Sequence, residues 1–166
     1  MILALDVHYR ENEAKAVGVL FNWDDEQPNK IIIEIIKAVD DYVPGEFYKR
    51  ELPCLLKVME NVTIQELEVI IIDGHIYTDN QGGFGLGGKL WECLNKQIPV
   101  IGVAKSPFYS NKQTVKEVFR GASDKPLFIS AIDYNLDVAV ANVKKMKGKY
   151  RIPTLLKTLD GITKND

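Results

Sequence analysis

Residues 67–75, with the sequence LEVIIIDGH, limit most strongly what this chain can fold into. The run from Val69 to Ile72 is uninterrupted, apolar and mostly β-branched, which is typical of a strand buried on both faces of a sheet. It ends in Asp73, followed by Gly74. Open α/β sheets place their chemistry at the carboxyl ends of central strands. The stretch therefore predicts a central strand that carries Asp73 to a site, the alternative being an Asp-Gly turn in which Asp73 only caps the backbone.

Length and composition indicate one ordinary globular domain over residues 1–166. The net charge of −2 gives no overall basic field, so binding to nucleic acid would need a local patch. Cys54 and Cys93 lack metal-ligand spacing, and we expect both to be buried in a reducing compartment. No apolar run is long enough to span a membrane, and Met1 leads directly into a strand. We expect a cytoplasmic protein without a membrane partner; its oligomeric state is left open.

The order of the remaining segments predicts a mixed α/β sheet. Apolar segments at 1–7, 14–21 and 31–36, joined by short polar connections, favour an antiparallel meander. Helical spacing begins at Arg50, with Pro53 in the first turn. Later segments predict strands at 99–105 and 126–130 and helices through residues 90–94, 112–121, 136–143 and 153–159. A meander followed by alternating helices and parallel strands makes one α/β domain.

A glycine-rich run, residues 82–88, precedes the predicted helix through residues 90–94. It lacks the lysine-serine ending of a phosphate-binding loop and does not follow a strand directly. We therefore expect a flexible loop or close helix packing there.

Four carboxylates fall at the edges of predicted elements: Asp6, Glu51, Asp73 and Asp160. If the first strand pairs with the strand before Asp73, then Asp6 and Asp73 face each other at one end of the sheet. Mg²⁺ prefers such oxygen ligands, and paired ions stabilise both oxygens of a phosphoryl displacement. Lys105, at the end of a neighbouring predicted strand, would supply positive charge for a developing oxyanion. The alternative is that these acids cap helices or remain solvated.

Several motifs resemble those of the endonuclease V family. Residues 42–51, YVPGEFYKRE, resemble its Tyr-Ile-Pro-Gly…Phe-Arg-Glu motif, including the interval from the tyrosine to the glutamate. Residues 73–75 resemble Asp-Gly-His-Gly, and residues 102–105 match Gly-Val-Ala-Lys. Residues 150–153, with Asp160 downstream, resemble the C-terminal Arg-Leu-Pro-Glu-Pro segment, and Asp6 fits the first-strand aspartate. The resemblance spans nearly the whole chain and implies a single RNase H-like domain, with a mixed sheet flanked by helices.

The resemblance also implies roles in catalysis. Asp6 and Asp73 would be the principal ligands of Mg²⁺, for which Mn²⁺ can substitute. Glu51 and Asp160 would complete the acidic site, and Lys105 would contact the scissile phosphate.

A second group of residues would read the substrate. Tyr42, with Val43, Pro44 and Gly45, would fill the gap left by a flipped, deaminated base. Backbone donors beside Gly45, Gly74 and Gly102 would approach that base closely.

The chain departs from the family pattern on the side that reads the substrate. Ile76 stands where the family has a glycine, and its side chain is expected to narrow the base pocket. Residues 78–83, TDNQGG, replace a His-Pro-Arg-Arg stretch, and residues 130–133 replace Ser-Pro-Gly-His. Three hypotheses follow: a Mg²⁺-dependent endonuclease acting near inosine in DNA or RNA, a diverged homologue that binds nucleic acid or a protein without cleaving, and a nuclease specific for another nucleic-acid structure.

Overall fold

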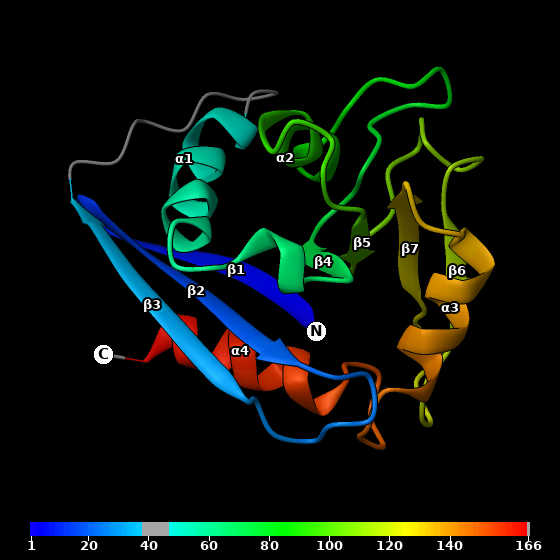
Figure 1. Cartoon of the computed structure of the whole chain (residues 1–166). Coiled ribbons are helices and arrows are strands. Elements are labelled where there is room, and N and C mark those ends of the chain that lie inside the picture. The colour runs from blue at the N-terminus through cyan, green and yellow to red at the C-terminus, as the bar shows by residue number, and fades with distance from the viewer. Residues whose placement is uncertain (38–46, 166) are drawn as a thin grey trace.

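The computed structural model describes residues 1–37 and 47–165, which form one seven-stranded sheet with helices on both faces (Figure 1). The strand order is β3-β2-β1-β4-β5-β7-β6. The strands are β1 (Ile2–Arg10), β2 (Glu13–Phe21), β3 (Lys30–Lys37), β4 (Val69–Asp73), β5 (Val100–Ala104), β6 (Lys116–Val118) and β7 (Leu127–Ile132). The helices are α1 (Phe47–Met59), η1 (Ile64–Glu66), α2 (Leu86–Cys93), α3 (Leu136–Lys145) and α4 (Thr154–Lys164). The predicted mixed α/β fold is confirmed.

Strand β4 occupies the centre of the sheet and is parallel to both of its neighbours, β1 and β5. Its four residues from Val69 to Ile72 are buried, as the apolar run predicts for a strand covered on both faces. The meander of β1, β2 and β3 is antiparallel, and β7 runs antiparallel to β5. Parallel pairing at the centre brings the carboxyl ends of β4 and β5 to one edge of the sheet.

Two hydrophobic cores lie on opposite faces of this sheet. Ile70 and Ile72 of β4 belong to the core beneath α1 and α2, whereas Val69 and Ile71 belong to the core beneath α3 and α4. Figure 1 shows α1 and α2 on one face and α4 on the other. Alternation along one strand therefore supplies both cores, because successive side chains of a strand point to opposite faces.

Four local predictions differ from the structure. Strand β1 continues past Val7 to Arg10, so Asp6 lies within it rather than at its end. Helix α1 begins at Phe47, which places Pro53 inside the helix rather than in its first turn. Residues 112–121 form no helix but include the short strand β6, paired with β7. Cys54 is buried as predicted, but Cys93 is exposed because it lies on the outer side of α2.

The glycine-rich run serves close helix packing, one of its two predicted roles. A Cβ atom on Gly87 would lie 2.4 Å from Cδ1 of Ile76, and one on Gly88 would lie 2.4 Å from the ring of Phe84. Both contacts are shorter than side-chain carbons tolerate, so α2 approaches the chain after β4 only because these positions are glycines.

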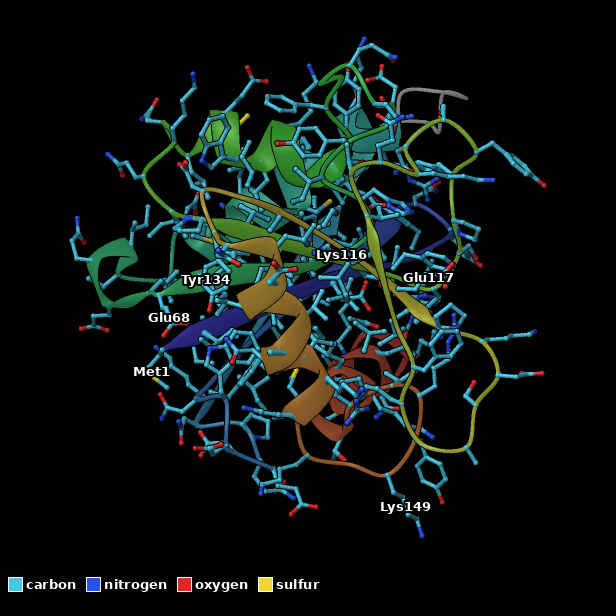
Figure 2. All side chains as sticks on the ribbon, turned by 90° about the vertical axis from the view of Figure 1, so that its right-hand side faces the viewer. Met1, Glu68, Lys116, Glu117, Tyr134 and Lys149 are labelled. Atoms are coloured by element: carbon cyan, nitrogen blue, oxygen red, sulfur yellow. The ribbon has the colours of Figure 1, made fainter. Side chains whose placement is uncertain are left out.

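The amino ends of the central strands carry a polar cluster away from the carboxyl edge of the sheet. Trp23 Nε1 and Tyr134 Oη both donate to Glu68 Oε2, at 2.9 and 3.1 Å. Figure 2 shows Glu68 and Tyr134 near Met1 at one side of the molecule, with Lys149 toward the other. This cluster ties the polypeptide before β4 to the chain after β2 and to the chain before α3. Within the described residues, no helix combines the length and apolarity needed to cross a membrane.

Candidate active site

The register of the central strands places Asp6 beside Asp73. Leu5 of β1 is the partner of Ile72 in β4, so the next residue of each strand is an aspartate. Asp6 and Asp73 both line one pocket on the face covered by α4. This adjacency is the one predicted from the sequence, although β1 runs four residues beyond Asp6.

Lys105 and Asp160 complete the polar rim of the same pocket. Lys105 directly follows β5, and its Nζ lies 3.7 Å from Oδ2 of Asp73. Asp160 lies on α4, and its Oδ2 forms an ion pair with Lys164 Nζ at 3.0 Å. The floor of the pocket is apolar and includes Ile71, Val103, Leu127, Ile152, Pro153, Leu156 and Leu159. Charged groups therefore stand above a surface of low polarity, where electrostatic interactions are stronger than in water.

Burial and mutual repulsion leave two acids of the site poorly compensated. Burial, together with the charge of Asp73, raises the pKa of Asp6 to about 7, even though the Val7 N–H donates to its Oδ1 at 2.9 Å. Burial and the charges of Asp6 and Asp73 raise the pKa of Glu51 to about 7. Glu51 comes from α1, on the opposite face of the sheet from α4. The four predicted acids thus gather from two strands, β1 and β4, and from two helices on opposite faces, α1 and α4, close enough to influence one another.

The described residues contain no ready-made cage of three or more His, Cys, Asp or Glu ligands. What they offer is an adjacent aspartate pair, with Glu51 and Asp160 within electrostatic range of Asp6. Mg²⁺ is commonly held by one or two carboxylates plus waters and substrate phosphate. The arrangement therefore fits a hydrated hard cation rather than one enclosed by protein ligands.

The predicted substrate-reading residues are placed less uniformly. Tyr42, Pro44 and Gly45 lie outside the described residues. Gly74 follows β4, and its N–H donates to Val103 O at 3.1 Å. A Cβ on Gly102 would lie 2.5 Å from Gly74 O, so packing against the protein's own backbone already requires glycine at that position.

We expected the Ile76 side chain to narrow a base pocket, but it points away from any pocket. It is fully buried and belongs to the core beneath α1 and α2. Its Cδ1 fills the space left by Gly87, and its N–H donates to the buried Ser130 Oγ at 3.1 Å. Ile76 therefore presents no surface to a substrate, because the whole residue is buried and its C=O also accepts from the Gly85 N–H at 2.8 Å.

Three residues near the acids were not predicted as part of the site. The ring of Tyr9 lies 3.5 Å beneath the guanidinium of Arg50, and burial, followed by the charge of Glu51, raises the pKa of Tyr9. Arg151 donates from Nη2 to Lys105 O at 2.5 Å and to Pro126 O at 2.7 Å, so it fixes the backbone that carries Lys105. Arg151 lies inside residues 150–153, one of the motifs that resemble the family, and this motif could have indicated its role. No sequence feature indicated Tyr9, because the first strand was expected to end before it.

A mixed sheet with facing aspartates, a lysine and an α4 carboxylate at its carboxyl edge defines an α/β protein with an acidic edge site. The family model of endonuclease V matches residues 1–160. The chain belongs to the endonuclease V family, as the sequence motifs indicated.

Individual relatives agree with this assignment. A Schizosaccharomyces pombe protein is 30% identical over 156 residues, covering 86% of this chain and 61% of the relative. Endonuclease V of Sulfolobus acidocaldarius is 30% identical over 112 residues, covering 66% of this chain and 52% of that protein. The chain thus spans between half and two-thirds of the length of these relatives.

A solved structure shares the fold. Ciona intestinalis endonuclease V, in complex with a 24mer DNA containing an inosine followed by a ribo-adenosine, superposes with a TM-score of 0.82 at 20% identity. The match covers 98% of this chain and 83% of that chain.

Proposed function

We propose that this chain is a metal-dependent endonuclease that hydrolyses a phosphodiester near a deaminated base, inosine, in DNA or RNA. The observation that carries the proposal is the Asp6–Asp73 pair at the sheet edge, with Lys105 Nζ 3.7 Å from Asp73 Oδ2. Membership of the endonuclease V family supports the reaction class, and the Ciona relative was solved with inosine-containing DNA.

The residues present fit a divalent cation. All four acids, Asp6, Glu51, Asp73 and Asp160, supply the hard oxygen donors that Mg²⁺ and Mn²⁺ accept. Burial and neighbouring carboxylates raise the pKa values of Asp6 and Glu51, so a bound cation would stabilise their charged forms. The buried hydroxyl of Tyr9, which has no hydrogen-bond partner among the described residues, would also gain one from a hydrated ion. Asp6 and Asp73 would hold the ion, with Glu51 and Asp160 nearby.

The reaction forms a bond from a water oxygen to phosphorus and breaks the bond from phosphorus to the 3′ oxygen. The products are a 3′-hydroxyl, which takes up a proton, and a 5′-phosphate. The bound cation supplies Lewis acidity and an activated water. Lys105, nearly half exposed, is free to move from Asp73 toward a phosphate oxygen and stabilise its charge. Arg151 positions Lys105 through its main-chain oxygen.

Recognition of the base is assigned to the chain around the carboxyl edge. In this proposal Tyr42, Pro44 and Gly45 fill the gap left by the flipped base. The partly exposed backbone at Gly74 faces that base, whereas Ile76 and Gly102 are buried and pack behind it. A nuclease with another substrate structure and a binding protein without cleavage are the competing outcomes.

The test is cleavage of matched oligonucleotides with and without inosine, single- and double-stranded, in Mg²⁺, Mn²⁺ or EDTA. We expect nicking beside inosine that requires metal and is lost in Asp73→Asn, while circular dichroism shows an unchanged fold. Undiminished cleavage by Asp73→Asn would overturn the proposed site. Binding of the oligonucleotide without cleavage in any metal would favour the non-cleaving homologue, and equal nicking of inosine-free branched substrates would favour the structure-specific nuclease.

A further inference from the structure

The segment after Lys105 projects an aromatic side chain into solvent beside the candidate active site. Tyr109 is 93% exposed, the highest value among the exposed large hydrophobic residues of the described chain. It lies four residues after Lys105 on the loop that leaves β5. Neither the acidic site nor the core uses its ring. An exposed ring at this position is unexplained by folding alone, because burying an aromatic ring is favourable.

The chain on both sides of Tyr109 is fastened to the protein. His75, which is buried, has Nε2 2.9 Å from Ser106 O, and its ring stacks on Phe108 with centroids 4.4 Å apart. On the other side, the fully buried Asn111 donates from Nδ2 to Tyr77 O at 2.8 Å. Tyr109 therefore projects from between two anchored residues, Phe108 and Asn111.

Two further hydrogen bonds hold the same loop against residues 78–80. Ser110 Oγ donates to Thr78 O at 2.7 Å, and the Gln113 N–H donates to Asn80 Oδ1 at 2.9 Å. Such anchoring limits the conformational entropy that the loop would lose when a ligand binds. The backbone that carries Tyr109 is thus held in place relative to Lys105.

The surroundings of the ring favour nucleic acid over a protein partner. Lys112 Nζ lies 5.9 Å from the Tyr109 ring centroid, and Lys105 precedes the loop. Beside the ring, Phe108 is exposed by 36% and adds some apolar surface, but Ser110 and Lys112 are polar and exposed, so the apolar surface here is narrower than a protein interface needs. Aromatic rings with nearby cations are the elements that bind single strands, because bases stack on the ring and phosphates meet the cations.

We propose that Tyr109 stacks on an unpaired base of the substrate strand whose phosphate lies at Lys105, and that this contact favours single-stranded over duplex substrate. The proposal rests on the proposed function in one respect, the placement of the strand at Lys105. A base inside a duplex is already stacked on both faces and has no free face for the Tyr109 ring, whereas an unpaired base has one.

The test measures binding separately from cleavage. Fluorescence anisotropy in EDTA follows a fluorescein-labelled inosine 15-mer, as single strand and as duplex, bound to wild type, Tyr109→Ala and Tyr109→Phe. We expect Tyr109→Ala to weaken single-strand binding about tenfold or more and duplex binding less than twofold. Tyr109→Phe retains the ring and should bind as wild type. Ile33→Ala removes an exposed side chain from β3, away from this loop, and serves as the matched control.

Unchanged single-strand binding by Tyr109→Ala would overturn the proposal, as would equal weakening for single strand and duplex. Thermal melting of each variant separates a lost contact from a damaged fold. A second readout replaces successive bases with 2-aminopurine, whose fluorescence should change on binding at one position in wild type and not in Tyr109→Ala. If wild type does not cleave but its binding of the single strand still depends on the Tyr109 ring, the stacking proposal stands and the proposed hydrolysis is refuted. If wild type cleaves and Tyr109→Ala binds equally well, only the stacking role falls.

Discussion

The acid half and the loop half of the candidate site are built by different means. The acid half comprises Asp6, Glu51, Asp73, Lys105 and Asp160, and three of these five lie on or directly after central strands. The loop half comprises residues 75–84 and 106–115, which contain no helix and no strand longer than an isolated bridge. The first is positioned by strand register and the second by side-chain hydrogen bonds. The halves should therefore respond differently to substitution: the acid half should lose activity, and the loop half should lose stability.

Asp6→Asn should give the largest effect and separate activity from stability. We expect cleavage to fall about a thousandfold, equivalent to about 4 kcal/mol of transition-state stabilisation. The melting temperature at pH 8 should rise, because the amide removes a buried charge beside Asp73 while its oxygen still accepts from the Val7 N–H. Single-turnover cleavage and calorimetry measure the two quantities. A loss of activity accompanied by a lower melting temperature would show that Asp6 is needed for the fold, and that activity and stability are not separated in the acid half.

Ile76→Ala should have the opposite signature in the loop half. Removing this fully buried side chain leaves a cavity against Gly87, which should reduce the free energy of unfolding by about 2 to 5 kcal/mol. Ile76→Val, the matched control, should cost about 1 kcal/mol. Urea denaturation measures both. If Ile76→Ala were as stable as wild type and gained preference for inosine, the side chain would be limiting a base pocket rather than filling the core.

Most of the fold and the acid half could be predicted because both depend on hydrophobic pattern. The apolar run before Asp73 identifies a central strand, and parallel pairing with the first strand then puts Asp6 at the same edge. The end of β1 could not be predicted, because residues 7–10 project beyond β4 and are only partly buried, so their sequence carries little apolar signal.

The loop half lacked such a pattern. Asp79 Oδ1 accepts the N–H groups of Gln81 and Gly83 at 2.9 Å each, and Asn111 Nδ2 lies 3.1 Å from His75 Nδ1. These contacts join residues up to 36 positions apart through single polar side chains. The hydrophobic periodicity of the sequence does not predict such contacts. The inward direction of Ile76 depends on Gly87, eleven residues later, and this pairing is visible only once the helix and loop are in contact.

A dependence of stability on Mg²⁺ should be confined to the acid half, whose two buried acids also make stability depend on pH. Without metal, Asp6 and Glu51 bind protons more tightly in the folded than in the unfolded chain, because their folded pKa values are raised from 3.8 and 4.5 to about 7. Their contribution is therefore favourable below about pH 4 and is lost as the pH rises to about 7. We expect a loss on the order of 2 kcal/mol for each acid between pH 5 and 8.

Mg²⁺ should reverse this loss. Titration at pH 8 should raise the melting temperature by several degrees, and at pH 5 by much less, because the protonated acids bind the ion weakly. Asp6→Asn should remove most of the response. Equal stabilisation by Mg²⁺ in the variant and in wild type would place the ion elsewhere on the protein.

Arg151→Lys should produce the smallest effect, because it tests the contact between the halves rather than either one. Arg151 Nη2 donates to Lys105 O and Pro126 O, and so fixes the backbone at the point where the acid half passes into the loop half. A lysine ammonium keeps the charge but cannot reproduce the planar fork. We expect kcat to fall about five- to tenfold with KM within twofold, since a displaced Lys105 stabilises the reacting phosphate less well without weakening the binding of the strand. A change in KM alone would instead mean that Arg151 contributes charge to the substrate surface. A fall in melting temperature without a kinetic change would mean that it only joins α4 to the sheet.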